Sequence, residues 1–287
     1  RSFFHWHELI VMWMFKALQA KFHTCHAKKW KSRKTQLSRL KIRAFFVCSA
    51  VNRRRRVSVM VILGFDSAMN GCSVALWRDG ACASKSEAMP SGQAQRLVPM
   101  IQEVLAEAGA AFSDINLIVT TVGPGAFTGI RIALSTARAL GLALDVPVKG
   151  ITTTDVLATD FFEKETLRDS ETLCVLIDTK RSDFYVQCFS ANGKTLSDPI
   201  SAAADDILNT LPPRTILIGD AVERFLSLVD SKDFQTRGGY TLPDPSVLCR
   251  LAAVRRIDNL LLPEPIYLRG ADVSQSKKIH RKIAAES

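Results

Sequence analysis

The chain has 287 residues, 47% of them hydrophobic, which is enough for a sizeable core in one bilobal unit or two small domains. Its net charge of +10 is uneven, because residues 1–56 hold 15 of the 38 Lys and Arg residues but only one acid, Glu8. The remaining 23 basic and 27 acidic residues give the rest of the chain a net charge of −4. No run in the basic segment reaches the ~20 apolar residues of a membrane helix, and we expect no membrane-spanning segment elsewhere.

The basic segment has two interpretations. Clusters such as NRRRR at residues 52–56 are typical of nucleic-acid-binding or targeting segments. Alternatively, the segment lies upstream of the true start, because the chain begins with Arg1 and a strand-like run begins at Met60; we favour this interpretation. The sequence HTCH at His23–His26 has no second pair of metal ligands, so we expect no metal site there.

Seven cysteines are scattered along the chain with irregular spacing and no C-x-x-C pair. This pattern predicts reduced thiols of a cytoplasmic protein rather than a disulfide framework.

The first elements after the basic segment are predicted to be strands. Apolar runs at Val59–Phe65 and Cys72–Trp77 flank a polar turn and predict a hairpin, which residues 81–87 extend with a third strand. From Ala94 to Ala108 the apolar residues recur at helical spacing, and Pro99 inside this pattern indicates a separate or kinked first turn.

A second group of elements follows. Ile115–Gly123 predicts a buried strand, and a Gly- and Pro-rich turn leads from it into a helix from about Thr128 to Leu144. Residues 152–162 predict another helix with a Thr near its N-cap.

The pattern then restarts. Residues 172–179 and 183–189 predict a second hairpin, followed by a short strand and a helix within 196–211 and a strand at 215–220. A helix at 246–257 and an extended segment at 264–270 complete the chain. Because both halves open with strand, turn and strand, we expect two similar lobes.

Asp66 stands at the end of the first predicted strand, within a tight turn. An acid at this position approaches the metal and phosphate in actin-like ATPase folds. Equally, its carboxylate can support the turn by accepting bonds from its own backbone.

The sequence GPGAFTGIR, whose glycines are Gly123, Gly125 and Gly129, forms what we call the glycine turn. Exposed N–H groups at a helix start attract anions, and Thr128 is placed to cap the helix. The standard nucleotide-binding fingerprints are absent. From the residues alone, we favour a tight strand–helix connection in which the glycines permit close packing.

The helix after the glycine turn is apolar over most of its circumference. Such a helix must be buried on two sides, and its own sheet covers only one. We therefore expect its small residues to let a second helix approach, either from another lobe of this chain or from another protein.

Together, five blocks resemble the TsaB (YeaZ) family: MVILGFDSAMNGCSVALWRDG, SGQAQRLVPMIQEVL, the strand and helix around GPGAFTGIR, LIDTKRSDFYVQCF and EPIYLRG. They occur in order over roughly residues 59–270. The resemblance implies an α/β actin-like (ASKHA) fold of two RNase-H-like lobes with mixed sheets. The implied lobes are 59–160 and 161–287, the latter with a basic tail, after a basic extension at 1–58.

The resemblance also implies a function. Members of this family are non-catalytic subunits that pair with a catalytic paralogue, TsaD, through helices of the N-terminal lobe, and a small ATPase, TsaE, joins them. The complex threonylcarbamoylates N6 of adenosine 37 in tRNAs that read ANN codons. The chain is then expected in the cytoplasm, away from membranes, contacting tRNA through the complex and able to form a homodimer when alone.

No cofactor of its own is implied, since ATP and a metal belong to the partner subunits. The paralogue binds its metal through H-x-x-x-H, where this chain has Gln93 and Leu97, which cannot replace imidazole ligands.

The expected site residues form two groups. The first is a vestigial phosphate loop, and the second is a partner interface on the helices at 94–108 and 128–144. The phosphate-loop group comprises Asp66, Gly123, Gly125, Thr128 and Gly129. The interface group comprises Leu97, Ile101, Leu105, Ile130, Arg131, Leu134, Ala137, Arg138 and Gly141.

Two other functions remain as alternatives. An actin-like enzyme such as a small-molecule kinase would use Asp66 and the glycine turn with Mg-ATP, but the second glycine-rich turn of such enzymes is reduced here to Gly219. A metalloprotease is disfavoured because H-x-x-x-H and H-E-x-x-H are both absent.

Overall fold

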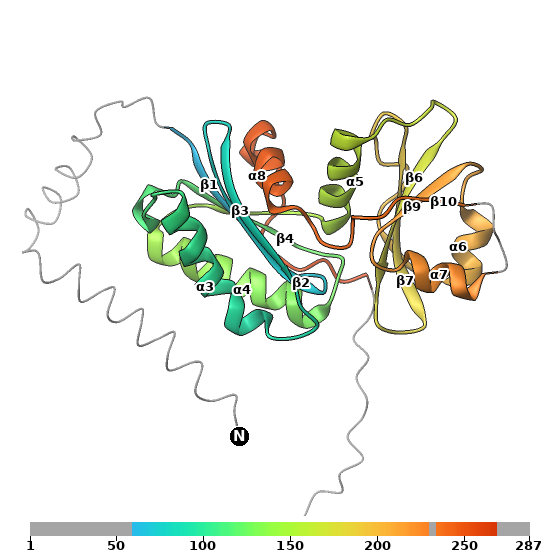
Figure 1. Ribbon diagram of the computed structural model, residues 1–287, viewed down its shortest axis with the longest axis horizontal. Helices are drawn as coiled ribbons and strands as arrows, with labels where there is room; N and C mark the ends of the chain where they lie inside the picture. Colours follow the sequence, from blue (N-terminus) through green and yellow to red (C-terminus); the bar gives the residue numbers. More distant parts are fainter. Residues whose placement is uncertain (1–58, 230–233, 269–287) are drawn as a thin grey trace, which may run out of the picture. The chain divides into compact units, whose positions relative to one another are not determined.

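A computed structural model describes residues 59–229 and 234–268, which form two α/β lobes (Figure 1). The first sheet has the strand order β3-β2-β1-β4-β5 and the second has the order β10-β9-β6-β7-β8. The strands of the first sheet are β1 (Val61–Asp66), β2 (Gly71–Arg78), β3 (Ala81–Ala88), β4 (Leu117–Thr121) and β5 (Val148–Ile151). Those of the second are β6 (Thr172–Asp178), β7 (Asp183–Ser190), β8 (Ile200–Ala203), β9 (Thr215–Ile218) and β10 (Gln235–Thr236).

The two sheets share one topology. In the first, β1, β2 and β3 are antiparallel, and β4 and β5 run parallel to β1. In the second, β6, β7 and β8 are antiparallel, and β9 and β10 run parallel to β6. The prediction of an actin-like fold with two similar mixed-sheet lobes is therefore confirmed.

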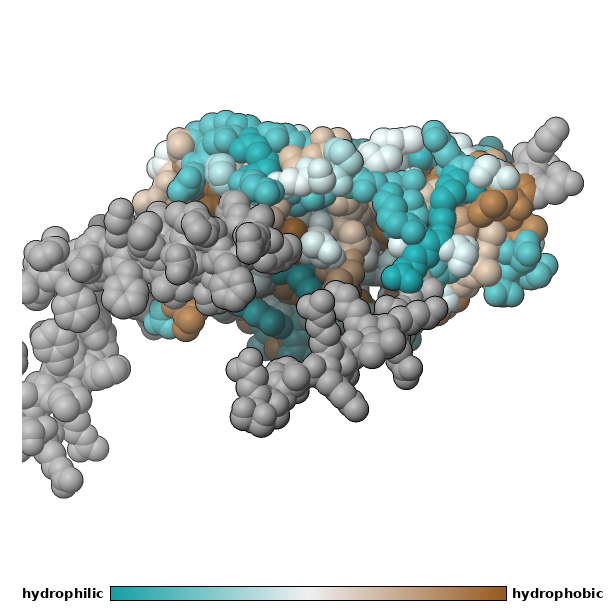
Figure 2. Space-filling view, turned by 90° about the horizontal axis from the view of Figure 1, so that it is seen from below, coloured by the Kyte–Doolittle hydropathy of each residue, from teal (hydrophilic) through white to brown (hydrophobic). Residues whose placement is uncertain are grey.

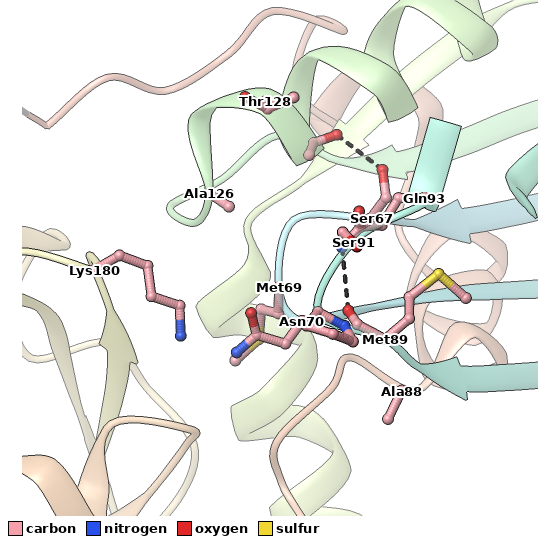
Figure 3. Close-up of a pocket in the computed structure, with 12 residues that line it drawn as sticks. Ser67, Met69, Asn70, Ala88, Met89, Ser91, Gln93, Ala126, Thr128 and Lys180 are labelled. Atoms are coloured by element: carbon pink, nitrogen blue, oxygen red, sulfur yellow. Dashed lines mark hydrogen bonds between the residues drawn. The ribbon is translucent and has the colours of Figure 1, made fainter. Parts of the chain in front are cut away.

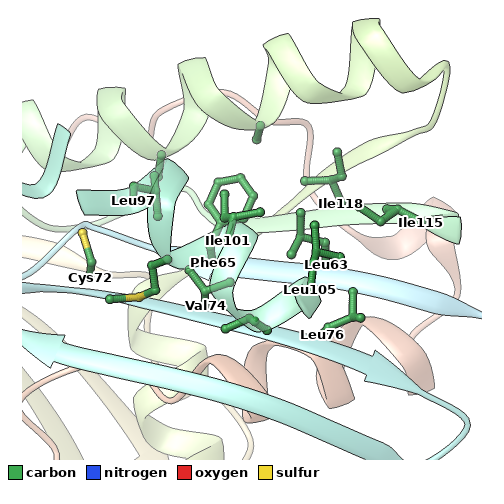
Figure 4. Close-up of a cluster of buried hydrophobic side chains, with 14 of the residues drawn as sticks. Leu63, Phe65, Cys72, Val74, Leu76, Leu97, Ile101, Leu105, Ile115 and Ile118 are labelled. Atoms are coloured by element: carbon green, nitrogen blue, oxygen red, sulfur yellow. The ribbon is translucent and has the colours of Figure 1, made fainter. Parts of the chain in front are cut away.

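Helices cover both faces of the first sheet. Helices α3 (Gln93–Glu107) and α4 (Phe127–Leu144) lie on one face, where Leu97, Ile101 and Leu105 of α3 pack on Phe65 and its neighbours (Figure 4). Helix α8 (Pro245–Val254) lies on the other face, although it comes from the end of the described chain (Figure 1).

The second sheet is covered in the same way. Helices α6 (Ala204–Thr210) and α7 (Val222–Leu228) pack on one face. There the rings of Phe184 and Phe225 meet edge to face, with their centroids 5.6 Å apart. Helix α5 (Thr153–Lys164) packs on the other face and also contacts α8. Two short 3₁₀ helices, Phe112–Asp114 and Ile257–Asn259, complete the described elements.

Three predictions about helix starts can be compared with the structure. Thr152 caps α5 by accepting a hydrogen bond from the Asp155 N–H at 3.1 Å, as predicted. The predicted Thr128 cap is wrong, because α4 begins one residue earlier, with Ala126 at its N-cap and no side-chain cap. Pro99 lies inside a continuous α3, so the first turn of α3 is not a separate helix.

The prediction of only reduced thiols is wrong for one pair. Cys174 and Cys188 form a disulfide between the neighbouring strands β6 and β7. The two residues face each other directly in the antiparallel register, which brings their Cβ atoms close. Cys72, Cys82 and Cys249 are free thiols in the described part of the chain.

Several predictions fall outside the described residues. They concern the basic segment with its HTCH sequence, and the basic tail after residue 268. Among the described helices, α4 is long and apolar enough to cross a membrane by length and composition alone. Its buried side chains pack into the core of the first lobe.

Candidate functional site

The glycine turn packs tightly against the turn between β1 and β2. Gly123 has a φ of 107°, a left-handed conformation that glycine adopts without strain. A Cβ atom on Gly125 or Gly129 would overlap the carbonyl oxygen of Ala68 or Ser67 respectively. The Ser67 hydroxyl also donates a hydrogen bond to the carbonyl of Gly129 at 2.8 Å. The glycines therefore permit a close contact between two turns, as the packing interpretation requires.

Asp66 supports its own turn. Its side chain is 1% exposed, and its carboxylate accepts hydrogen bonds from the Ala68 N–H at 3.0 Å and from the Thr121 hydroxyl. Burial raises the pKa of Asp66 to about 6, although these hydrogen bonds act in the opposite direction. Asp66 does not line the neighbouring cavity, so the geometry favours the turn-supporting interpretation over phosphate or metal binding.

A cavity of about 830 Å³ lies beside the glycine turn (Figure 3). Its walls come from the β1–β2 turn, the β3–α3 connection, the start of α4 and Lys180 of the second lobe. Of the five predicted phosphate-loop residues, only Thr128 and Gly129 line it. Gln93 also lines it, and its amide donates a hydrogen bond to the carbonyl of Met89 at 3.2 Å. The cavity presents uncharged polar groups and thioethers, with one lysine at its edge.

A second acidic group lies at the equivalent end of the second sheet. Asp178 ends β6 as Asp66 ends β1, and its carboxylate binds the Lys180 ammonium at 3.0 Å. Burial acts to raise the pKa of Asp178, but hydrogen bonds from Lys180 outweigh burial and hold it below its usual value. Burial raises the pKa of the adjacent Asp220 to about 6. The Asn70 amide donates to Asp220 at 3.4 Å and joins the two lobes.

Sequence reasoning missed this second acidic group. The signal was present, because LIDTKRS repeats the strand–Asp–turn order of LGFDSAMNG. Within the described ranges, no three or more His, Cys, Asp or Glu side chains gather in a way that could hold a metal ion.

Seven of the nine predicted interface residues lie inside the core of this chain, so the prediction that they contact a partner is corrected. They are Leu97, Ile101, Leu105, Ile130, Leu134, Ala137 and Gly141. The physical reason is that α3 and α4 need these stripes to cover their own sheet. A Cβ atom on Gly141, for example, would overlap the side chain of Val148 in β5. Arg131 and Arg138 are exposed.

The outer side of α3 carries no charge. The exposed residues there are small or uncharged: Ala94, Gln95, Val98, Pro99, Gln102 and Ala106, whereas the exposed Glu107 at the end of α3 pairs with Lys85 of β3. The charged residues of α3 lie on its flank toward β3, where Arg96 and Glu103 bind Glu87 and Lys85. This separation leaves the outer side of α3 free of charged groups that a partner would have to desolvate.

The outer side of α4 continues this surface. Its side toward α3 carries Ile132, Thr136, Ala139 and Ala143, which are half-buried or exposed. We call these four residues, together with the six uncharged exposed residues of α3 given above, the α3–α4 face. Across the surface visible in Figure 2, hydrophobic side chains are scattered among hydrophilic ones.

Comparison with known proteins places this geometry in context. A family model described as TsaD, tRNA N6-adenosine threonylcarbamoyltransferase, matches residues 91–235. The tRNA threonylcarbamoyladenosine biosynthesis protein TsaB of Escherichia coli is 35% identical over 126 residues, covering 44% of this chain and 53% of the relative. TsaB of Buchnera aphidicola subsp. Schizaphis graminum is 30% identical over 167 residues, covering 56% of this chain and 78% of the relative.

A solved structure has the same fold. YeaZ from Pseudomonas aeruginosa is 25% identical, with a TM-score of 0.60, and the match covers 73% of this chain and all of that chain. The sequence match with the E. coli relative spans about half of that protein's length.

Proposed function

Because the chain belongs to the TsaB/YeaZ family, we propose that it takes part in tRNA threonylcarbamoyladenosine biosynthesis as a scaffold subunit rather than as the catalyst. It pairs with a TsaD-like catalytic paralogue, and a TsaE-like ATPase joins the pair. The assembly transfers threonylcarbamoyl to N6 of adenosine 37 in tRNAs that read ANN codons. ATP and the metal belong to the partners, and the assembly works in the cytoplasm.

The α3–α4 face is the observation that carries this proposal. It joins two helices of 15 and 18 residues along sides made of small and uncharged residues, with the exposed Arg131 and Arg138 of α4 at its edge. Such helices can meet two helices of a partner in a four-helix bundle, because small side chains allow close approach. A stable interface needs about 800 Å² from each partner, which two helices of this length can supply.

The residues at the start of α3 support a non-catalytic role. Gln93 stands at the cavity and Leu97 is fully buried in the core, at the two positions compared with the metal-binding histidines of the paralogue. An amide is a poor zinc or iron ligand, and a buried leucine provides no ligand atom.

A binding experiment tests the proposal. Val98→Glu combined with Ala139→Glu places two charges on the α3–α4 face, and we expect the Kd for a purified TsaD-family subunit to rise more than about 100-fold, or about 2.7 kcal/mol. Leu228→Glu is the matched control, because Leu228 is an exposed apolar residue of the second lobe. Isothermal titration measures all three proteins, and wild-type affinity in the double variant would contradict the proposal.

The kinase alternative is tested on the isolated chain. Titration with ATP and Mg²⁺ is expected to give no binding in the micromolar range, because the acid that would approach the phosphates is bonded within its own turn. Micromolar binding with turnover would favour the enzyme instead.

A further inference from the structure

The last described segment, Leu260–Leu268, runs back across the first lobe, and we call it the C-terminal strap. Leu261 exchanges two backbone hydrogen bonds with Gly150 of β5, at 2.9 and 3.0 Å. Further along, the Ile266 N–H donates to the carbonyl of Val122 at 2.8 Å. These bonds fix the strap to the ends of β4 and β5.

The strap is also fixed to α4 by apolar packing. Ile266 lies against a small cluster of Ala68, Val122, Ile130 and Leu134. Its carbonyl oxygen lies near the position of a Cβ on Gly123. The strap therefore has a defined position relative to the outer surface of α4.

The strap and α4 together hold an exposed arginine between two aromatic rings. The guanidinium of Arg131 lies 3.7 Å from the ring centroid of Phe127 and 5.8 Å from that of Tyr267. Its Nε also donates a hydrogen bond to the Tyr267 hydroxyl at 2.9 Å. The two rings remain 54% and 48% exposed.

Arg138 is held in a similar way two helical turns later. Its guanidinium donates a hydrogen bond to the carbonyl of Pro263 in the strap. The two arginines are seven positions apart in the helix, which is about 10 Å along the axis. Both lie at the edge of the α3–α4 face that borders the strap.

These two guanidiniums are not paired with acids among the described residues, since both contact only rings, a hydroxyl or a carbonyl. Other arginines differ: Arg96, Arg237 and Arg250 each bind a carboxylate. An ordered, uncompensated guanidinium beside exposed aromatic rings is typical of an interface anchor, because little side-chain entropy remains to be lost on binding.

We propose that Arg131 and Arg138, held in place by the C-terminal strap, bind carboxylates of the sister subunit at the edge of the α3–α4 face. This inference rests on the proposed function and adds the strap to the interface. A protein partner is favoured over nucleic acid because the site continues an uncharged helical face and residues 57–287 carry a net charge of −4.

The test compares charge variants in titrations with the TsaD-family subunit. Arg131→Gln and Arg138→Gln are each expected to raise Kd about 10-fold, and the double variant about 100-fold. Arg131→Lys keeps the charge but loses the planar stack, so we expect an intermediate loss. Arg168→Glu is the control, because Arg168 is exposed in the second lobe and its side chain forms no hydrogen bond or ion pair with the residues that the structure describes. Thermal melting of each variant checks that it is folded.

Salt provides a second readout. Between about 50 and about 500 mM NaCl the wild-type affinity is expected to fall, and the double Gln variant is expected to lose most of this dependence. A purely structural role for the arginines would leave the salt dependence unchanged.

Four outcomes would overturn the inference. If both Gln variants bind like wild type while Val98→Glu with Ala139→Glu does not, the inference fails and the proposed function stands. If wild type does not bind at all, both fail. If the Gln variants keep their affinity for the subunit but bind tRNA more weakly within the complex, the arginines contact nucleic acid. If they change only self-association in sedimentation, the occupant is a second copy of this chain.

Discussion

The two lobes have the same topology but different helical layers. In the first lobe, α3 and α4 are 15 and 18 residues long, and the α3–α4 face that they share is uncharged apart from Arg131 and Arg138 at its edge. In the second lobe, α6 and α7 are seven residues each and begin with acidic residues, Asp205, Asp206 and Glu223. One topology thus carries a long surface suited to helix association in one lobe and a short polar surface suited to solvent in the other.

The turns at the sheet ends differ as well. Asp66 is buried and bonded to backbone and a hydroxyl, whereas Asp178 at the equivalent position has a lysine partner. The pKa of Asp66 is raised and that of Asp178 is lowered. Equivalent acids therefore contribute to stability with opposite dependence on pH.

The largest effect on stability is expected at the glycine turn. Gly129→Ala would place a Cβ against the backbone carbonyl of Ser67, which cannot move aside as a side chain could. We expect the free energy of unfolding to fall by about 3 kcal/mol, the upper range for overpacking, although Gly→Ala within a helix usually stabilises. Urea denaturation measures the change.

Gly141→Ala is the matched control in the same helix. Its Cβ would clash with the Val148 side chain, which can rotate, and would lie 3.2 Å from the Val146 carbonyl oxygen, so we expect a loss of about 1 kcal/mol or less. In the second lobe, Gly219 repeats the tight approach, with a φ of 116° and the Leu176 carbonyl in the way. Equal losses at Gly129 and Gly141 would contradict the steric explanation.

The second effect is on the pH dependence of stability. The pKa of Asp66 rises from 3.8 to about 6 on folding, so the folded state binds this proton more tightly. Its contribution is fully present below about pH 4 and is lost as pH rises through 6, which amounts to at most about 3 kcal/mol. Asp66→Asn keeps an acceptor for the Ala68 N–H but cannot ionise.

Urea unfolding at pH 5 and pH 8 checks this prediction. We expect ionisation of Asp66 to lower the free energy of unfolding of the wild type between pH 5 and pH 8. In Asp66→Asn this contribution is absent, so we expect a smaller loss. The pKa of Asp220 is also raised to about 6, so Asp220 lowers stability over the same pH range. Asp66→Asn is therefore expected to reduce the dependence of stability on pH without removing it. Because the pKa of Asp178 is lowered from 3.8, this group is ionised in both states over this range, and Asp178→Asn is expected to leave the slope between pH 5 and pH 8 unchanged. An unchanged dependence of the free energy of unfolding on pH in Asp66→Asn would contradict the prediction.

The smallest effect is expected at two threonines. Thr152→Ala removes the cap of α5 and should cost about 1 kcal/mol, whereas Thr128→Ala should change stability by less than about 0.5 kcal/mol because Thr128 caps nothing. Thermal unfolding of the two variants separates them, and equal losses would show that Thr128 supports α4 after all.

Much of the fold was predictable from hydrophobic periodicity. Both hairpins, the three long helices and the two-lobe arrangement follow from apolar spacing that local residues determine. The short strand β5, helix α7 and the two-residue β10 were not predicted, because so few residues carry little periodic signal. The Cys174–Cys188 pairing depends on the β6–β7 register, which spacing along the chain does not reveal.

The site was less predictable. Periodicity showed that α4 is apolar nearly all round, but it could not say which stripe faces the sheet. The small residues Ala137 and Gly141 were expected to face outward, and they pack inward because β5 comes close to α4. The stack of Arg131 with Tyr267 joins residues 136 positions apart, so only the folded chain reveals it.

Helix α8 has a consequence for synthesis of the protein. It covers one face of the first sheet, with the Cys249 thiol packed against Gly64 of β1, yet it is among the last elements of the described chain to leave the ribosome. That hydrophobic face of the nascent first sheet therefore stays uncovered until residues 245–254 have been made. A premature stop before residue 245 would leave that face open to chaperones and proteases, even though every strand of the sheet is present.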